Sequence, residues 1–143
     1  METKILVLYS FAHTKYKTMR ELTRAEEQVM QILWDLDKAF VKEIVEKFAD
    51  PKPAYNTVST IIRILQEKGF VDHETFGKSH RYFPLVDKET YTRKFLRNFV
   101  GNYFENSYSQ MVSFLTRSEN IDLKELEDIL QKVKEAQQAE RKK

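Results

Sequence analysis

The sequence predicts a mainly α-helical protein with one small β-hairpin, arranged as two successive helical units. Three apolar patterns with a helical period of about 3.6 residues follow one another between residues 24 and 68. Two short runs on either side of Phe76-Gly77-Lys78-Ser79 are typical of a hairpin. A third observation is the scarcity of turn formers, because the 143 residues include only three glycines and three prolines.

The first two helices are predicted over residues 24–36 and 41–49. Thr23 is the expected N-cap of the first helix, and Glu26 reaches back to complete a capping box. The second helix ends before Asp50-Pro51-Lys52-Pro53, because proline disfavours a helical conformation in the residue that precedes it.

A third helix is predicted over residues 55–68, with Gly69 as its C-terminal stop. Its apolar stripe comprises Val58, Ile61, Ile62 and Leu65. Two strands, residues 70–75 and 80–85, then follow with residues 76–79 as the loop between them. The predicted order is therefore helix, helix, helix, hairpin.

Residues 88–143 predict a separate set of helices. Seven of the chain's aromatic residues lie between positions 91 and 114, and either Gly101 or the Asn106-Ser107 pair is expected to divide this stretch into two helices. Asp122 to Glu125 resembles a second capping box and begins a last amphipathic helix. The polar tail from Gln137 is expected to fray.

The exposed face of the third helix suggests a reader of the DNA major groove. Asn56, Ser59, Thr60 and Arg63 lie opposite its apolar stripe, and such side chains bond base edges and phosphates. No acidic residue occurs in the sixteen positions from Pro51 to Gln66, as expected of a surface that meets phosphate. The alternative is an ordinary solvated face on which Arg63 pairs with Glu67.

The hairpin is the second candidate DNA contact. Residues 76–85 are also free of acids and carry Lys78, His80 and Arg81. Lys78 at the tip is the preferred phosphate contact. For Arg81 an alternative stays open, because a register that pairs Thr75 with His80 places Glu74 opposite Arg81 as a cross-strand ion pair.

Other functional classes find little support in the sequence. The net charge of +2 gives no overall basic field, and the absence of cysteine excludes disulfides and thiolate metal sites. Asp72-His73-Glu74 cannot converge on one metal or substrate, because consecutive strand residues point to opposite faces. We therefore expect no enzyme, no cofactor and no bound metal.

The first nineteen residues are treated as a separate extension. The apolar run Ile5-Leu6-Val7-Leu8 is too short to span a membrane, and its flanking residues do not suit a signal peptide. Residues 1–19 are expected to be a frayed tail or the product of a misplaced start codon, with a short ordered arm as the alternative. The protein is expected to be cytoplasmic and without a membrane partner.

The aromatic segment predicts a dimer interface. A unit of 56 residues buries too little surface to cover so many large side chains, and a symmetric partner would cover the rest. A monomeric helical core and a ligand pocket lined by the rings are the alternatives. The residues expected at the interface are Tyr91, Phe95, Phe99, Tyr103, Met111, Leu115, Leu126, Ile129 and Leu130.

Residues Thr23 to Val86 resemble the DNA-binding domain of the penicillinase-repressor (BlaI/MecI) family, which are winged-helix repressors of bacteria. Four stretches carry the resemblance, which covers about residues 22–135. They are Ala25-Glu26 with Val29-Met30-Gln31-Ile32-Leu33-Trp34, Tyr55-Asn56-Thr57-Val58-Ser59-Thr60, Leu65-Gln66-Glu67-Lys68-Gly69-Phe70-Val71, and His80-Arg81-Tyr82 before Pro84-Leu85-Val86.

The resemblance implies a winged helix-turn-helix domain over residues 20–87 and a helical dimerisation domain over residues 88–143. It implies a homodimer that represses resistance genes at an inverted-repeat operator, with Thr57 and Thr60 where the recognition helix meets DNA. In some members a sensor-linked protease leads to cleavage next to a phenylalanine. Ser113-Phe114 is the matching pair here, with serine where the best-known members have asparagine.

Together these observations predict a transcriptional repressor that binds a palindromic operator, with proteolysis in the C-terminal domain as a candidate route of release. Asn56, Ser59, Thr60 and Arg63 would read bases, while Thr57, Lys78 and His80 would bind phosphates. The alternative is a helical protein–protein adaptor that uses the aromatic segment on another protein and does not bind DNA.

Overall fold

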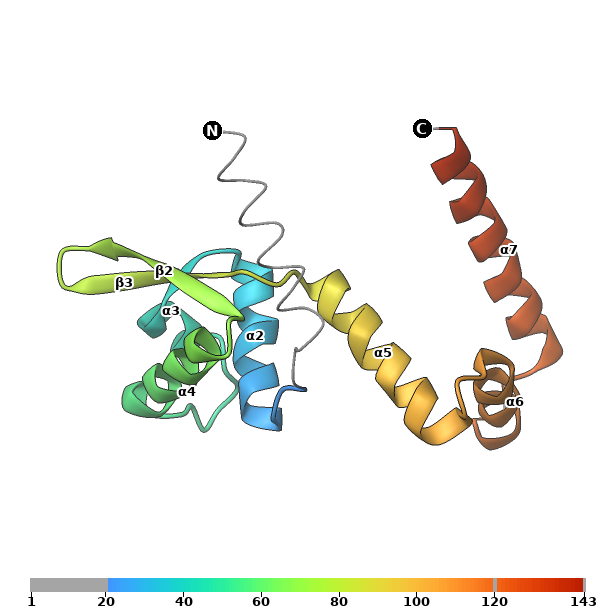
Figure 1. Cartoon of the computed structure of the whole chain (residues 1–143), viewed down its shortest axis with the longest axis horizontal. Helices are drawn as coiled ribbons and strands as arrows, with labels where there is room; N and C mark the ends of the chain where they lie inside the picture. The colour runs from blue at the N-terminus through green and yellow to red at the C-terminus, as the bar shows by residue number, and fades with distance from the viewer. Residues whose placement is uncertain (1–20, 120, 143) are drawn as a thin grey trace. The chain divides into compact units, whose positions relative to one another are not determined.

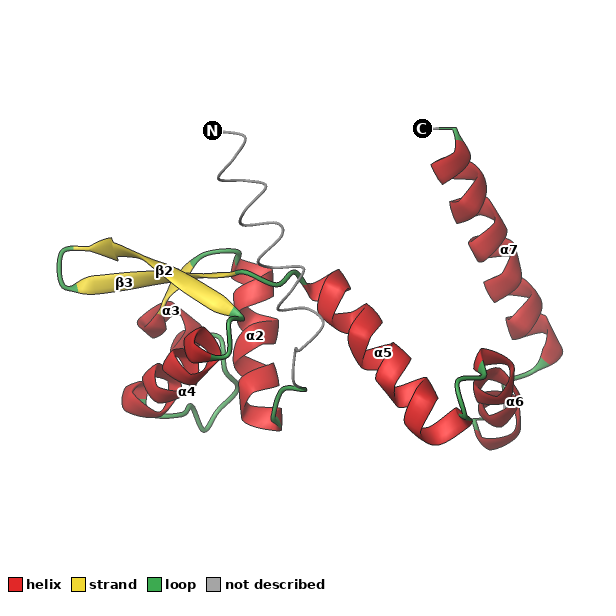
Figure 2. Cartoon of the chain, in the orientation of Figure 1, coloured by secondary structure: helices red, strands yellow, loops and turns green. Residues whose placement is uncertain are grey.

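The computed structural model describes residues 21–119 and 121–142, and the predicted extension over residues 1–19 lies outside them. The protein is mainly helical with one small antiparallel sheet, so the predicted fold class is confirmed (Figures 1 and 2). Its elements are α2 Arg24–Leu36, β1 Ala39–Phe40, α3 Val41–Glu46, α4 Tyr55–Glu67, β2 Val71–Phe76, β3 Ser79–Pro84, α5 Lys88–Phe104, α6 Tyr108–Ser118 and α7 Leu123–Arg141.

The predicted capping box begins α2. The Thr23 hydroxyl accepts a hydrogen bond from the Glu26 amide at 3.3 Å, and the Glu26 carboxylate accepts one from the Thr23 amide at 3.1 Å. Glu26 is only 6% exposed, and Lys68 Nζ lies 2.8 and 2.9 Å from its two carboxylate oxygens. One side chain thus caps α2 and ties it to the end of α4.

The next two helices differ in how well their ends were predicted. α3 stops at Glu46, three residues early, and the amides of Lys47 and Phe48 bond carbonyls only three residues back. The end of α4 has the hydrogen bonds of a Schellman motif, in which the Gly69 amide bonds the Gln66 carbonyl and the Phe70 amide bonds the Leu65 carbonyl. Gly69 has φ 84°, a left-handed conformation that glycine adopts without strain.

The hairpin is tighter than predicted, and the sheet has one more strand. Phe76 pairs with Ser79, so the connecting loop is only Gly77-Lys78, with Gly77 at φ 60°. The predicted four-residue loop is therefore wrong, because β2 continues through Phe76 and β3 already begins at Ser79. The two-residue strand β1 adds to β3 to give the order β1-β3-β2, the sheet of a winged helix.

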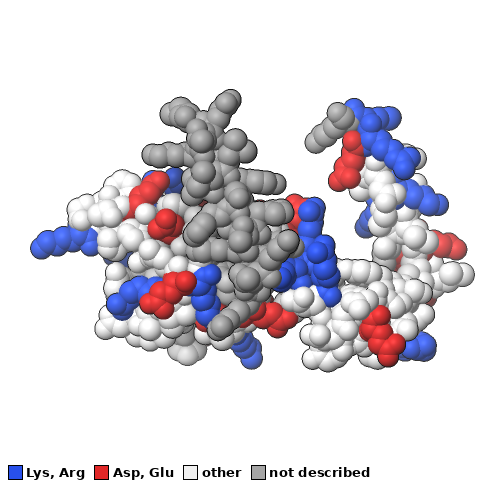
Figure 3. Space-filling view, in the orientation of Figure 1, with Lys and Arg blue, Asp and Glu red and all other residues white. Residues whose placement is uncertain are grey.

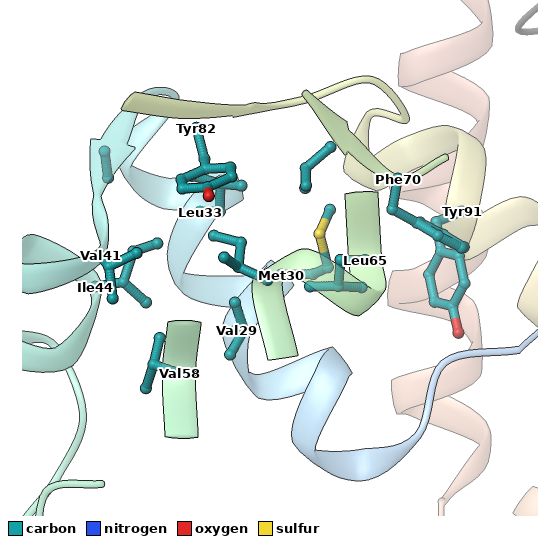
Figure 4. Close-up of a cluster of buried hydrophobic side chains, with 13 residues drawn as sticks. Val29, Met30, Leu33, Val41, Ile44, Val58, Leu65, Phe70, Tyr82 and Tyr91 are labelled. Atoms are coloured by element: carbon teal, nitrogen blue, oxygen red, sulfur yellow. The ribbon is translucent and has the colours of Figure 1, made fainter. Parts of the chain in front are cut away.

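The core of the first unit joins three helices to the inner face of the sheet (Figure 4). Val58, Ile62 and Leu65 are fully buried, as predicted, whereas Ile61 is only half-buried. The fully buried residues of α2 pack against them. The core cluster contains Val29, Met30, Leu33, Ala39, Val41, Ile44, Val58, Ile62, Leu65, Phe70, Val71, Tyr82 and Tyr91.

Tyr91 joins the first turn of α5 to this core. Its ring lies 5.8 Å from the rings of both Trp34 and Phe70, and its hydroxyl accepts a hydrogen bond from the Leu22 amide at 3.0 Å. Burial raises the pKa of Tyr91 above its usual value, although the bond from Leu22 opposes the rise. The chain divides into two compact units within α5, between Phe95 and Leu96.

The second unit contains the rest of α5 with α6 and α7. Its helices break at Glu105 and Asn106, with φ 51° and 64°, whereas Gly101 stays inside α5, so the second predicted break is the correct one. Asp122 caps α7 by accepting a hydrogen bond from the Glu125 amide at 2.8 Å. α7 continues to Arg141 and does not fray from Gln137.

Candidate nucleic-acid interface

The exposed stripe of α4 is a polar surface backed by a fully buried one. Asn56, Thr57, Thr60 and Arg63 are exposed and Ser59 is half-buried. Val58, Ile62 and Leu65 on the opposite side anchor the helix in the core. The packing therefore fixes which side chains this helix offers to a partner.

Two side chains of the stripe bond the helix that carries them. The Thr60 hydroxyl donates to the Asn56 carbonyl at 2.9 Å, so only its lone pairs remain to accept bonds from a partner. The Arg63 Nε lies 3.5 Å from the Ser59 carbonyl, which steers the guanidinium along the helix. Within residues 21–119 and 121–142, Arg63 forms no ion pair with Glu67 or with any other acid. The ion pair between Arg63 and Glu67, which was the alternative expectation, does not form among the described residues.

The hairpin tip presents a basic side chain. Lys78 occupies the two-residue loop and is exposed, and no acid in the described part of the chain pairs with it. In Figure 3 a basic side chain projects from the end of the first unit where Figure 1 places the turn between β2 and β3. Such a position suits contact with a phosphate backbone.

Arg81 takes the alternative role that the sequence analysis left open. Glu74 pairs with Arg81 in the strand register, and the Arg81 guanidinium lies 2.9 Å from the Glu74 carboxylate. Lys38 Nζ lies 3.2 Å from the same carboxylate. Hydrogen bonds from Arg81 and then Lys38 hold the pKa of Glu74 below its usual value. Arg81 therefore takes part in an ion pair on the outer face of the sheet, and its contact with DNA stays a prediction.

A groove of about 750 Å³ connects α4 with the hairpin. His80 and Lys78 line it from the hairpin and Ser59 lines it from α4. Sequence reasoning missed two of its residues: Tyr55, which is 56% exposed at the start of α4, and Lys42 near the start of α3. The position of Tyr55 next to Asn56 could have indicated it, whereas nothing in the sequence links Lys42 to the hairpin.

The charge of this groove favours an anionic partner. Lys42 and Lys78 contribute positive charge, and Glu43 is the acid among the lining residues. The Glu43 carboxylate already accepts a hydrogen bond from the Phe40 amide at 2.9 Å, so it serves as a helix cap. Tyr82 is buried beneath the groove, and that burial raises its pKa.

The predicted dimerisation residues fall into two groups. Tyr91 is 6% exposed and belongs to the core of the first unit, so it offers almost nothing to a partner. The others leave apolar area uncovered, and Tyr103 and Leu130 reach exposed fractions of 73% and 57%. Phe95, Phe99 and Ile129 are also exposed, whereas Met111, Leu115 and Leu126 are half-buried.

The predicted cleavage pair lies in the middle of a helix. Ser113 and Phe114 are exposed residues of α6, and Phe114 stacks near Phe104 at a centroid distance of 5.6 Å. Neither α6 nor α7 contains a buried residue. In residues 21–119 and 121–142 no helix is long and apolar enough to cross a membrane, and no cluster of three metal-binding side chains is found.

Comparison with known proteins agrees with this geometry. The family model described as the penicillinase repressor matches residues 22–135. The chain belongs to the penicillinase repressor family. The family match begins beside the cap of α2 and ends inside α7, so it includes the α4 stripe, the hairpin and the helices of the second unit.

Curated members of the penicillinase repressor family are distant in sequence. The methicillin resistance regulatory protein MecI of Staphylococcus aureus strain N315 is 28% identical over 110 residues, covering 76% of this chain and 89% of MecI. The penicillinase repressor of Bacillus licheniformis is 20% identical over 120 residues, covering 83% and 94%. The solution structure of the DNA binding domain of the repressor BlaI aligns with 23% identity and a TM-score of 0.45, covering 51% of this chain and 90% of that one.

Proposed function

We propose that this protein is a transcriptional repressor that binds double-stranded DNA. The observation that carries the proposal is the exposed, acid-free stripe of α4 beside a groove with basic side chains from α3 and the hairpin. A helix with short polar side chains and an arginine that pairs with no acid of the described residues suits the major groove, and lysines at its flank suit the phosphates. Membership of the penicillinase repressor family supports the same function.

The residues divide into two kinds of contact. The side of α4 that faces solvent is proposed to read base edges. Its residues are Asn56, Ser59, Thr60 and Arg63. Thr57, Lys78 and His80 are proposed to bind phosphates. Lys42 and Tyr55 complete the phosphate-binding groove.

The DNA-binding proposal is tested by titrating the full chain against a random 30-base-pair duplex at several salt concentrations. Affinity should fall steeply as salt rises, because each neutralised phosphate releases counterions. The competing function, a helical adaptor, is favoured by the exposed aromatic side chains of the second unit. An adaptor would leave DNA unbound at every salt concentration.

We further propose that the repressor is a homodimer held by the second unit and that it binds a palindromic operator. The helices α5 to α7 expose many large apolar side chains, and exposed apolar surface of this kind marks protein–protein contact sites. Light scattering at micromolar concentration should give about twice 17.1 kDa. Leu130→Asp should yield a monomer because it places a charge in the proposed interface. Leu85→Asp, at an exposed leucine of the first unit, is the matched control and should leave the dimer intact.

Release by proteolysis within α6 is the last part of the proposal. The peptide bond between Ser113 and Phe114 is helical, so α6 must unwind locally before a protease can bind it in an extended form. Because α6 buries none of its residues, such unwinding should require little free energy. A membrane-linked sensor protease is the proposed partner for this step.

A further inference from the structure

Two histidines lie against each other beneath the hairpin. His73 comes from β2 and His80 from β3, and their ring centroids are 4.2 Å apart. The strand register pairs His73 with Tyr82 and Thr75 with His80, so both imidazoles share the sheet face of the buried Tyr82. This face is the one that looks toward α4 and the proposed DNA groove.

The two rings have different surroundings. The His73 Nδ1 lies 3.2 Å from the Gln66 amide oxygen on α4, so this ring contacts the helix. The same nitrogen lies 3.9 Å from the Asp72 carboxylate. The His80 Nδ1 lies 3.5 Å from the Thr75 hydroxyl, and His80 is exposed at the wall of the groove. His73 is therefore tied to α4, whereas His80 is open to a partner that enters the groove.

We propose that His73 is a positioning residue for His80 and that the hairpin takes up a proton when it binds DNA. Two imidazolium charges at this separation repel each other, so a charge on His73 opposes a charge on His80. A phosphate in the groove stabilises a charge on His80. Imidazole is the side chain that changes charge between about pH 5 and 8, so DNA affinity becomes dependent on pH in that range. This inference rests on the proposed DNA-binding function.

Both acidic and basic side chains surround the two histidines. Asp72 and Glu43 favour protonation, whereas three cations oppose it, and Glu43 is engaged as a helix cap. The titratable or charged groups that face the pair from α3, α4 and the hairpin are Lys42, Glu43, Tyr55, Arg63, Asp72, Lys78 and Tyr82.

The test measures the affinity of the full chain for a random 30-base-pair duplex between pH 6 and pH 8 at constant ionic strength. For the wild type, affinity should fall about three- to tenfold over this range, because linkage allows up to about tenfold per pH unit for one proton taken up. His80→Gln should abolish most of this dependence. His73→Gln should keep it but move the fall to higher pH, since His80 then holds its proton without a like charge beside it.

Two matched variants separate this role from a structural one. Lys78→Gln should weaken binding at every pH and keep the wild-type pH profile. His13→Gln removes the remaining histidine of the chain and should keep both affinity and profile. A wild-type affinity that does not change with pH overturns the inference while leaving the DNA-binding function intact. An unshifted profile in His73→Gln overturns the positioning role, and failure to bind DNA at any pH overturns the proposed function itself.

Discussion

Arg63 and Lys78 carry the same charge but are proposed to meet DNA in different ways. Arg63→Ala should weaken binding to a duplex selected from a random pool by about 1–3 kcal/mol per subunit and relax the preference at one base position. Lys78→Ala should weaken all sequences alike and reduce the salt slope by about one per subunit. Competition titrations with selected and random duplexes measure both effects.

A matched control for these variants is Lys124→Ala. Lys124 is an exposed lysine of α7 and is not one of the proposed DNA-binding residues. It should change neither specific nor random binding. If Arg63→Ala reduced the affinity for selected and random duplexes by the same factor, Arg63 would be a phosphate contact. The assignment of the α4 stripe to base reading would then be wrong.

Glu26 is a buried residue that joins two elements of the first unit. Glu26→Ala removes the reciprocal cap of α2 and leaves the Lys68 ammonium without its carboxylate. Because the carboxylate is buried while Lys68 is partly exposed, we expect the free energy of unfolding to fall by about 2–3 kcal/mol. Urea denaturation measures the change, and Glu27→Ala at the adjacent, more exposed position should alter it by less than about 1 kcal/mol.

For contacts between single residues, the sequence predicts those whose two residues lie close together along the chain. The bonds between Thr23 and Glu26 were predictable, because a capping box joins residues three positions apart. The pairing of Glu26 with Lys68 was not, because 42 positions separate them. The ion pair of Glu74 with Arg81 was predictable as an alternative, since the hairpin itself sets the cross-strand register.

At the scale of elements, periodicity located the 13-residue helices α2 and α4 better than the six-residue α3. α2 and α4 were predicted within one residue, because each shows an apolar stripe over several turns and a clear end signal. β1 was missed because two residues cannot show an alternating pattern; it forms only because Ala39 and Phe40 pair with Tyr82 and Arg81. The end of α5 was ambiguous, since Gly101 and Asn106 both suit a helix break.

Tyr91 fixes the start of α5 on the first unit and should make stability sensitive to alkaline pH. Its folded-state pKa lies above the unfolded value because of burial. The stabilisation is therefore fully present below about pH 10, the unfolded tyrosine value, and is lost as pH rises through the folded value. Melting temperatures between pH 8 and pH 11 should fall, and they should fall less steeply for Tyr91→Phe.

The same variant also tests the hydrogen bond to Leu22 at neutral pH. Losing the hydroxyl should lower the free energy of unfolding by about 1 kcal/mol, as is usual for a single neutral hydrogen bond. Tyr103→Phe is the control, since its ring is 73% exposed. An identical alkaline profile for Tyr91→Phe and the wild type would mean that Tyr91 does not couple folding to pH.

For the whole molecule, the gaps in acidic residues are the sequence feature that indicates the proposed DNA-binding surface. Those gaps coincide with α4 and the hairpin, which line one groove in the structure. The contribution of Lys42 could not be predicted, because it depends on how α3 packs beside both elements. Tyr91 was assigned to the dimer interface because an aromatic count cannot distinguish a ring buried in one unit from a ring left uncovered.

The division of the chain within α5 leads to a prediction about release. Every residue of the first unit's core cluster lies between Val29 and Tyr91, so a chain that ends at Ser113 keeps that core complete. It loses α7 and half of α6, and with them Leu126, Ile129 and Leu130. It should fold its winged helix but dimerise poorly. Two linked half-site contacts bind far more tightly than one, because the second contact is effectively intramolecular.

The measurement compares three chains, comprising residues 1–143, 1–136 and 1–113, on full and half operators selected from a random pool at one fixed salt concentration. The chain 1–113 should match the intact protein on the half operator and bind the full operator at least about a hundredfold more weakly, the usual range of such linkage. The chain 1–136 is the matched control, because it loses only the polar end of α7 and should behave as the intact protein does. Equal full-operator affinity for all three chains would show that dimerisation does not need α7, and a signal for release other than cleavage within α6 would then have to be sought.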